Sequence, residues 1–276
     1  MAPVPPPGTD VAPGDGPPQA DSADRYREAL TAALLADDVA AALWSMVDSG
    51  LAERAVPELP ALRLEQDPIH RHKDVLAHTI AVTAKTPHDL RTRLAALFHD
   101  IGKPATRRID EGGVTFRHHE AVGAKMTRKR LRALGYPEDI VRDVTELVRL
   151  SGRFKGFAAG WSDSAVRRYA RDAGPLLGHL NELVRSDCTT RNPRKRQELQ
   201  HHVDELERRI AELAEADRLA AERPLLDGQA VMEHLGLSPG PEVGAAMRFL
   251  LDLKRSEPDL DRDATVERLD AWWRSR

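Results

Sequence analysis

A pair of polar side chains, His99 and Asp100, follows directly on an apolar helical run. Burying ionisable groups is costly unless other groups satisfy them, so the fold must bring partners to this point. Two residues have suitable chemistry: His78 on the preceding predicted helix and Asp187 much further along the chain. A His…His-Asp…Asp set of this kind requires three helices to pack around one point.

The composition suits a fold made of helices. Hydrophobic residues make up 41% of the 276 residues, which is enough for a core. Only 4% of the residues are aromatic, so the core must consist mainly of Leu, Val and Ala, as is more typical of packed helices than of β-sandwiches. We therefore predict an all-α chain, in which a helical bundle is followed by a long helix and a small helical tail.

Several classes of protein are excluded at this stage. The single cysteine, Cys188, rules out a disulfide framework or a cysteine-based zinc site, and it suits the reducing cytoplasm. We expect no membrane anchor, because no apolar run approaches the ~18 residues of a membrane span, and no secretory signal is visible. The net charge of −3 means that any binding to nucleic acid would need a local basic face.

The chain divides into four predicted parts. Residues 1–22 are rich in Pro, Gly and Asp and are expected to be a disordered tail. Residues 23–66 form a first helical segment, residues 67–192 hold the bundle with the metal-binding residues, and residues 193–276 contain the long helix and the helical tail. Apolar residues in 193–221 alternate steps of four and three, which fits either a helix laid along its own domain or a dimeric coiled coil.

Helices are predicted wherever apolar residues recur at intervals of three or four. Gly102 and Pro104 are expected to end the helix that carries His99, and Ser151–Gly160 are expected to be a loop. No strand of ordinary length is predicted, although residues 114–116 follow a Gly-Gly turn and are expected to be extended. Beyond the first segment, the predicted helices span 74–85, 90–101, 120–134, 137–150, 163–172, 175–187, 193–221, 228–235, 241–253 and 264–273.

The four residues of the His…His-Asp…Asp set are candidate metal ligands. Taken alone, a buried His is more often a satisfied core residue, but the joint pattern favours a site. Two imidazoles and two carboxylates leave coordination positions open for water and substrate, which is typical of a catalytic centre. Such a mixed set suits one divalent ion, either Mn, Fe, Co, Ni, Zn or Mg, without selecting among them. A bound ion activates water and polarises a phosphoryl oxygen.

Further residues are candidates for chemistry beside the metal. Lys103 would either reach a phosphate or lie in solvent, and His119 would either ligate a second ion or donate a proton to a leaving group. With Asp100, these two are the candidate catalytic residues. Solvated helix faces explain most runs of basic residues, but Arg also makes bidentate contacts to phosphate. The candidate substrate-binding residues are Lys103, Arg128, Arg167, Arg168 and Arg191.

Together these residues resemble the HD-domain superfamily of metal-dependent phosphohydrolases, which are all-helical; the matching residues are His78, His99-Asp100 and Asp187. A closer resemblance is to the end of the neck, the HD domain and the tail of bacterial CCA tRNA nucleotidyltransferases, over about residues 30–273. It implies that residues 23–66 are neck-like and that 67–192 are the HD domain. The shared phrases are Leu62–Asp67, His99–Arg107, His118–Ala124, Thr189–Asn192 and Asp227-Gly228 through Pro239–Pro241.

Two departures from the family pattern limit what the resemblance implies. No Gly-Ser followed by an Asp-x-Asp pair precedes residue 30, so the nucleotidyltransferase head is expected to be missing and CCA addition is not implied. Relatives tend to carry histidines after the helix that ends near Leu150, where this chain has Ser151 and Lys155. A mononuclear metal site is therefore expected.

The sequence leads to one main functional hypothesis and two alternatives. The main hypothesis is a stand-alone cytoplasmic metal-dependent phosphohydrolase for a nucleoside monophosphate, a 2′,3′-cyclic phosphate or an RNA end. The first alternative, favoured by the tail and the basic helices, is a non-catalytic module that binds tRNA or another RNA. The second is an HD-type di-iron oxygenase, against which Ser151 counts. The oligomeric state stays undetermined.

Overall fold

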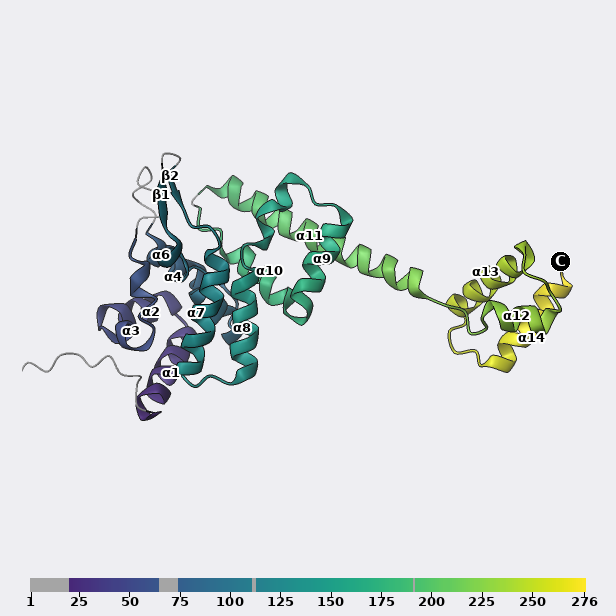
Figure 1. The fold of residues 1–276 in the computed structure, drawn as a ribbon, viewed down its shortest axis with the longest axis horizontal. Coiled ribbons are helices and arrows are strands. Elements are labelled where there is room, and N and C mark those ends of the chain that lie inside the picture. Colours follow the sequence, from purple (N-terminus) through teal and green to yellow (C-terminus); the bar gives the residue numbers. More distant parts are fainter. Residues whose placement is uncertain (1–19, 65–73, 111–112, 191) are drawn as a thin grey trace, which may run out of the picture. The chain divides into compact units, whose positions relative to one another are not determined.

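The computed structural model describes residues 20–64, 74–110, 113–190 and 192–276. Nearly all of its elements are helices (Figure 1), which confirms the all-α prediction. Most of the predicted N-terminal tail and part of the Leu62–Asp67 phrase lie outside the described residues. The chain forms two compact units, one up to Ile210 and one from Ala211 onward. None of the described helices is both long and apolar enough to cross a lipid bilayer.

The larger unit is a helical bundle with short connections. Its 3-10 turns are η1 (Pro60–Leu62), η2 (Arg153–Ala159) and η3 (Gly174–Leu176). Its helices are α1 (Ala20–Leu34), α2 (Val39–Asp48), α3 (Leu51–Ala55), α4 (Val75–Lys85), α5 (Leu90–Phe98), α6 (Lys103–Thr106), α7 (His119–Ala133), α8 (Glu138–Leu150), α9 (Asp163–Ala173), α10 (Leu177–Ser186) and the first part of α11 (Pro193–Ala221).

Side-chain caps fix where the helices of the bundle begin. Asp74 accepts the N–H of Leu76 at 3.0 Å and starts α4, and Asp89 accepts the N–H of Thr92 at 2.8 Å and starts α5. Ser162 caps α9, as its sequence position predicts. Two helices that carry candidate ligands therefore begin at positions that the sequence itself defines.

α5 is the central helix of the bundle. Every side chain from Thr92 to Phe98 is buried, and a helix that is buried on all sides must be surrounded by other helices. α4, α8 and α10 pack against it, and α7 lies beside α8 (Figure 1). The C-terminal end of α5, which leads into the His-Asp pair, consequently lies inside the protein.

The ends of several elements differ from the sequence-based expectation. The helix predicted over 90–101 ends at Phe98, with His99 at its C-cap. Pro104 does not end a helix but lies in the first turn of α6, where the missing N–H of proline costs no hydrogen bond. The expected loop Ser151–Gly160 contains the 3-10 turn η2. The expected extended piece is part of a hairpin, in which β1 (Arg108–Asp110) pairs antiparallel with β2 (Gly113–Thr115).

α11 spans the predicted residues, and its first half belongs to the larger unit. Val203 and Leu206 are fully buried, and Arg185 of α10 pairs with Asp204 and with Glu207 of α11, each at 2.6 Å. This part of the helix lies along its own domain, which is one of the two arrangements that the heptad spacing allows. The boundary between the compact units thus lies within α11, whereas the sequence placed the start of the last segment at Pro193.

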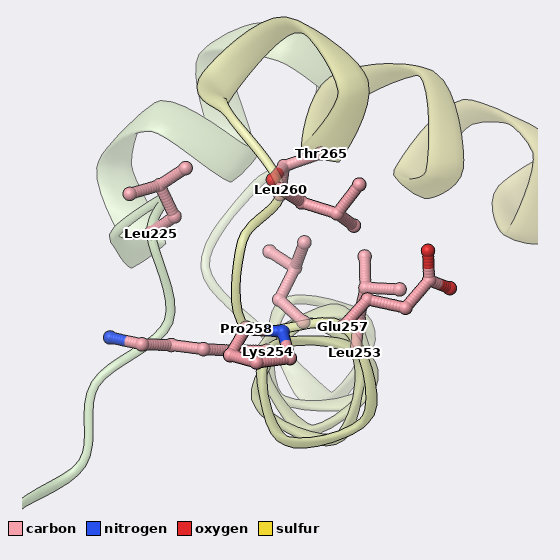
Figure 2. Close-up of a pocket in the computed structure, with 8 residues that line it drawn as sticks. Leu225, Leu253, Lys254, Glu257, Pro258, Leu260 and Thr265 are labelled. Carbon is pink, nitrogen blue, oxygen red and sulfur yellow. The ribbon is translucent and has the colours of Figure 1, made fainter.

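The smaller unit has a core of its own. It contains α12 (Gly228–Leu235), α13 (Pro241–Ser256) and α14 (Arg262–Arg274). A pocket of about 30 Å³ opens beside this core, between the end of α13 and the start of α14 (Figure 2). The buried core residues are Leu226, Val231, Ala246, Leu250, Leu253 and Leu269.

Candidate metal centre

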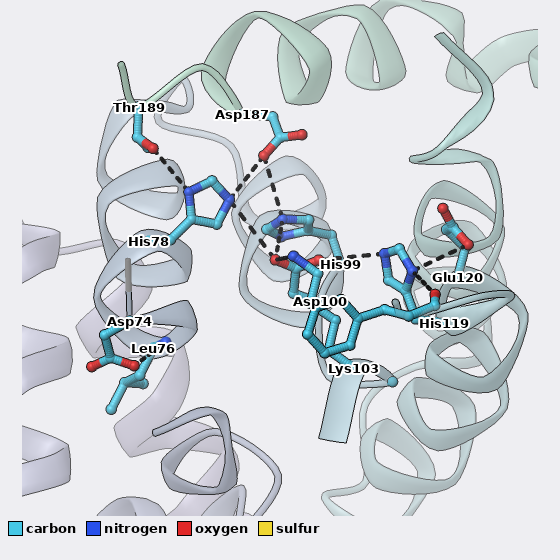
Figure 3. A network of polar contacts seen from close by, with 12 residues as sticks. Asp74, Leu76, His78, His99, Asp100, Lys103, His119, Glu120, Asp187 and Thr189 are labelled. Carbon is cyan, nitrogen blue, oxygen red and sulfur yellow. Dashed lines mark hydrogen bonds and ion pairs between the residues drawn. The ribbon is translucent and has the colours of Figure 1, made fainter. Parts of the chain in front are cut away.

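Three helix ends and one helix face bring the predicted ligands together (Figure 3). His78 projects from α4, His99 is the C-cap of α5, Asp100 follows it in the turn, and Asp187 is the C-cap of α10. His78, His99 and Asp187 each place one ligand atom within 4.8 Å of the others. Asp100 lies against the same two imidazoles.

The separations between these atoms fit a single ion. Asp187 Oδ1 lies 3.0 Å from His78 Nε2 and 3.6 Å from His99 Nε2. Asp100 Oδ2 lies 3.2 Å from His99 Nε2 and 3.8 Å from His78 Nε2. Ligands bound at about 2.1 Å from a metal are separated by about 3.0 Å at neighbouring octahedral positions and about 3.4 Å in a tetrahedron. The four side chains are therefore spaced like the ligands of one ion.

A buried nitrogen without a partner identifies the centre of the cluster. His99 Nε2 is buried and has no hydrogen-bond partner. The other ring nitrogen, Nδ1, lies 2.7 Å from the carbonyl oxygen of Ala96; a carbonyl can only accept, so Nδ1 carries the proton. The lone pair of Nε2 then faces the two carboxylates. A histidine held in this way is typical of a metal ligand, so the donor set fits a divalent ion.

Two more imidazoles are oriented through their Nδ1 atoms. His78 Nδ1 lies 2.9 Å from the hydroxyl of Thr189, and His119 Nδ1 donates to the carbonyl of Phe116 at 2.8 Å. His119 Nε2 lies 3.5 Å from Asp100 Oδ1, so the first residue of α7 reaches the opposite side of the same carboxylate. The sequence analysis did not assign a role to Thr189 or Phe116; the shared Thr189–Asn192 phrase was the one available signal.

Lys103 faces the cluster rather than solvent. Its side chain is only 8% exposed, and its Nζ lies 2.7 Å from Asp100 Oδ2 and 5.6 Å from the centre of the Phe116 ring. Of the two alternatives that the sequence left open, the structure excludes a solvated lysine. The ammonium group uses one donor on Asp100, which leaves N–H groups for an anion beside the metal position.

The electrostatics of the cluster favour a cation. Burial lowers the pKa of His99, but Asp100 and Asp187 more than offset this and raise it to about 10. Burial raises the pKa of Asp187, yet hydrogen bonds from His78 and His99 leave it far below its ordinary value. The pKa of Asp100 is also lowered well below its ordinary value, by His99, His119 and Lys103 against the effect of burial. Two ionised carboxylates thus face one point.

The stretch where relatives tend to carry histidines makes other contacts here. Ser151 donates its hydroxyl to the carbonyl of Val148 at 2.9 Å. Lys155 pairs with Glu120 at 3.0 Å, and a Cβ on Gly152 would lie 2.1 Å from the same carboxylate. Glu120 is therefore held by an ammonium and by close packing, in keeping with the expectation of a mononuclear site.

The predicted arginines are not gathered at the cluster. Arg128 follows His119 by nine residues on α7, about 13 Å along the helix axis. At that end of the helix, Arg132 and, more weakly, Arg128 lower the pKa of Glu138. Arg167 and Arg168 lie on α9, an element that contributes none of the four predicted ligands. Arg191 lies outside the described residues. The roles of these arginines in substrate binding stay predictions.

Comparison with known proteins agrees with this geometry. A protein-family model, described as HD domain, matches residues 75–174. An A-adding tRNA nucleotidyltransferase of Deinococcus radiodurans is 33% identical over 241 residues, which cover 84% of this chain and 54% of that protein. A CC-adding tRNA nucleotidyltransferase of Thermus thermophilus is 35% identical over 241 residues, which cover 83% of this chain and 52% of that protein. The chain spans about half the length of these relatives.

Proposed function

The chain carries an HD domain and is related over 241 residues to bacterial tRNA nucleotidyltransferases, and from this premise we propose that it is a metal-dependent phosphohydrolase. Its substrate is a nucleotide phosphate ester, such as a nucleoside monophosphate or a 2′,3′-cyclic phosphate. The observation that carries this proposal is the buried, unpartnered Nε2 of His99 beside the carboxylates of Asp100 and Asp187.

The metal would be held by two imidazoles and two carboxylates: His78, His99, Asp100 and Asp187. A divalent ion bound there would supply Lewis acidity, which lowers the pKa of a coordinated water and polarises a phosphoryl oxygen. Asp100 has a second task, because the oxygen that faces His99 also accepts a hydrogen bond from Lys103. Through this carboxylate the ligand set and the phosphate-facing lysine share one position.

Two residues of the chain would act on the substrate directly. Lys103 holds a phosphate oxygen, because its buried ammonium carries N–H groups beyond the one directed at Asp100. His119 serves as the proton donor: Phe116 accepts from Nδ1, so the protonated ring presents its second N–H from Nε2 beside Asp100. The leaving alkoxide of the sugar would take up this proton.

The experiment that tests the function is phosphate release by metal-stripped protein. The panel contains 5′-, 3′- and 2′-nucleoside monophosphates and 2′,3′-cyclic phosphates, each with Mn, Co, Ni or Mg restored and each compared with Asp100→Asn. Turnover that depends on metal and disappears in the variant is expected. A protein that binds an ion but turns over no member of the panel, or one that binds no ion, would contradict the proposal.

A second candidate function is supported by the relatives. Both are tRNA nucleotidyltransferases, and each match spans more of this chain than its HD domain. The chain would then bind tRNA without hydrolysing phosphate esters. A tRNA gel shift that weakens with salt and survives the loss of His99 and Asp100 would favour this function over hydrolysis.

A further inference from the structure

A polar groove of about 490 Å³ begins where the metal cluster ends. Thr189 belongs to both, since its hydroxyl meets His78 Nδ1 at 2.9 Å and its side chain also lines the groove. The walls come from the end of α4, the end of α10 with the segment that follows it, and the start of α11. The lining residues are Lys85, Glu182, Arg185, Ser186, Cys188, Thr189, Thr190, Arg196 and Gln200.

Two positive charges in the groove are left without carboxylate partners. Arg185 is neutralised by Asp204 and Glu207 at 2.6 Å each and approaches Glu182 at 3.6 Å. Lys85 donates to the carbonyl oxygen of Cys188 at 2.5 Å, and within the described part of the chain it forms no ion pair. Arg196 is exposed on α11, and no ion pair of its side chain is found among the described residues either.

The groove is positioned to receive the continuation of a substrate bound at the cluster. Lys85 follows His78 by seven residues on α4, about 10 Å along the helix axis. Stacked nucleotides advance about 3.4 Å each along one strand, so this distance corresponds to about three nucleotides. A mononucleotide held at the metal would therefore not reach the ammonium of Lys85.

We infer that this groove binds the backbone phosphates of a single-stranded oligonucleotide whose terminal phosphate lies at the metal cluster. The inference rests on the proposed hydrolase function and narrows its substrate class from mononucleotides to strand ends. Lys85 and Arg196 contact backbone phosphates, and the hydroxyls of Thr189 and Thr190 line the path between them and the metal ligands. Phosphate contacts of this kind do not read the base sequence.

The test compares a uridine trinucleotide that ends in a 3′-phosphate with uridine 3′-monophosphate. Binding is measured by calorimetry on the full-length metal-free chain, so that turnover does not interfere. Two variants remove one charge each: Arg196→Ala, and Lys85→Gln, whose amide still donates to the carbonyl of Cys188. Lys129→Ala, an exposed cation on α7, is the matched control.

We expect the trinucleotide to bind at least tenfold more tightly than the monophosphate. Each groove variant should weaken the trinucleotide about fivefold and leave the monophosphate unchanged, and each should lower the salt dependence of log K by about 0.7. Lys129→Ala should bind both ligands like the unaltered chain. Trinucleotide binding that neither groove variant weakens would overturn the inference, and so would displacement of the trinucleotide by an equal concentration of a tetraglutamate peptide.

The proposed function is tested separately in the same set of proteins. Metal is restored and release of phosphate from the monophosphate is measured, a reaction in which the groove takes no part. Turnover without a groove effect contradicts only the oligonucleotide inference. A groove effect without any turnover supports the groove as a strand-binding site and contradicts the hydrolase.

Discussion

Single residues around the cluster act through hydrogen bonds to the second nitrogen of each imidazole. His99 donates to a backbone carbonyl inside its own helix end, so no side-chain substitution removes that bond. His78 instead depends on the hydroxyl of Thr189. The orientation of one metal ligand is therefore open to a mild mutation at a residue that does not itself touch the metal position.

We predict that Thr189→Val lowers the affinity for a divalent ion by about 10- to 100-fold, because the ring of His78 loses the partner that orients it. The measurement is a competition titration with a chelating dye. Thr115→Val on the hairpin strand β2 makes the same chemical change away from the cluster and should leave the affinity as it is. Equal affinities in the two variants would mean that Thr189 does not orient His78.

One residue near the cluster has a strained backbone. His118 has φ +61°, the one positive value for a non-glycine among the described residues, and this left-handed conformation costs about 1–2 kcal/mol for a residue with a Cβ. Glycine has no such cost and is accepted at the N-cap position. The strain is located directly before His119, where α7 begins.

His118→Gly should raise the free energy of unfolding by about 0.5–1 kcal/mol, since part of the relief is offset by the greater freedom of glycine in the unfolded chain. Urea denaturation of the variant and of His118→Ala measures the effect, and the alanine variant should show no gain. A glycine variant less stable than the unaltered chain would show that contacts of the His118 side chain outweigh the strain.

Among the elements, the contact between the turn after α5 and the start of α7 fixes the geometry of the site. A Cβ on Gly102 would lie 2.1 Å from the carbonyl oxygen of His119 and 2.7 Å from the nitrogen of Gly123. Both are backbone atoms, which cannot rotate away. Only glycine lets the turn that carries Asp100 approach α7 closely enough for His119 to face the carboxylate.

Gly102→Ala should therefore destabilise the protein by about 1–3 kcal/mol, the usual range for forcing extra atoms into a packed site. It should also weaken turnover by moving His119 away from Asp100. Gly178→Ala on α10 is the matched control, because its added Cβ meets nothing within 4 Å and alanine favours helix. Urea midpoints that fall by similar amounts in both variants would contradict the close-approach argument.

At the scale of the whole molecule, chemistry and tail reside in separate compact units. The four predicted ligands, Lys103 and His119 all precede Ile210, and the core of the smaller unit follows Ala211. Small units bury a modest fraction of their surface and have little stability to spare. Damage to the core of the smaller unit should therefore remain within that unit.

Leu250→Ala tests this separation, because Leu250 is 1% exposed in the core of the smaller unit. Removing it should cost about 2–5 kcal/mol and largely unfold α12, α13 and α14. Hydrogen exchange should then rise throughout residues 222–276, while metal affinity and the protection of α5 stay unchanged. A loss of metal affinity in this variant would show that the two units are coupled.

The sequence by itself determined the helices and the presence of an HD domain. Apolar spacing and capping residues act over one or two turns of chain, so α4, α9 and α11 could be predicted from local information. The joint pattern of histidines and aspartates indicated the metal cluster because those side chains have few other reasons to follow an apolar run.

Only the tertiary structure decided which side chains share a surface. Packing around α5 placed Lys103 against Asp100 and left Arg128 at the far end of α7, although both are basic residues near the motif in sequence. The groove exists because the end of α4 meets the segment after Asp187 and the start of α11. Its parts are more than a hundred residues apart, and the packing of helices, which local spacing does not encode, brings them together.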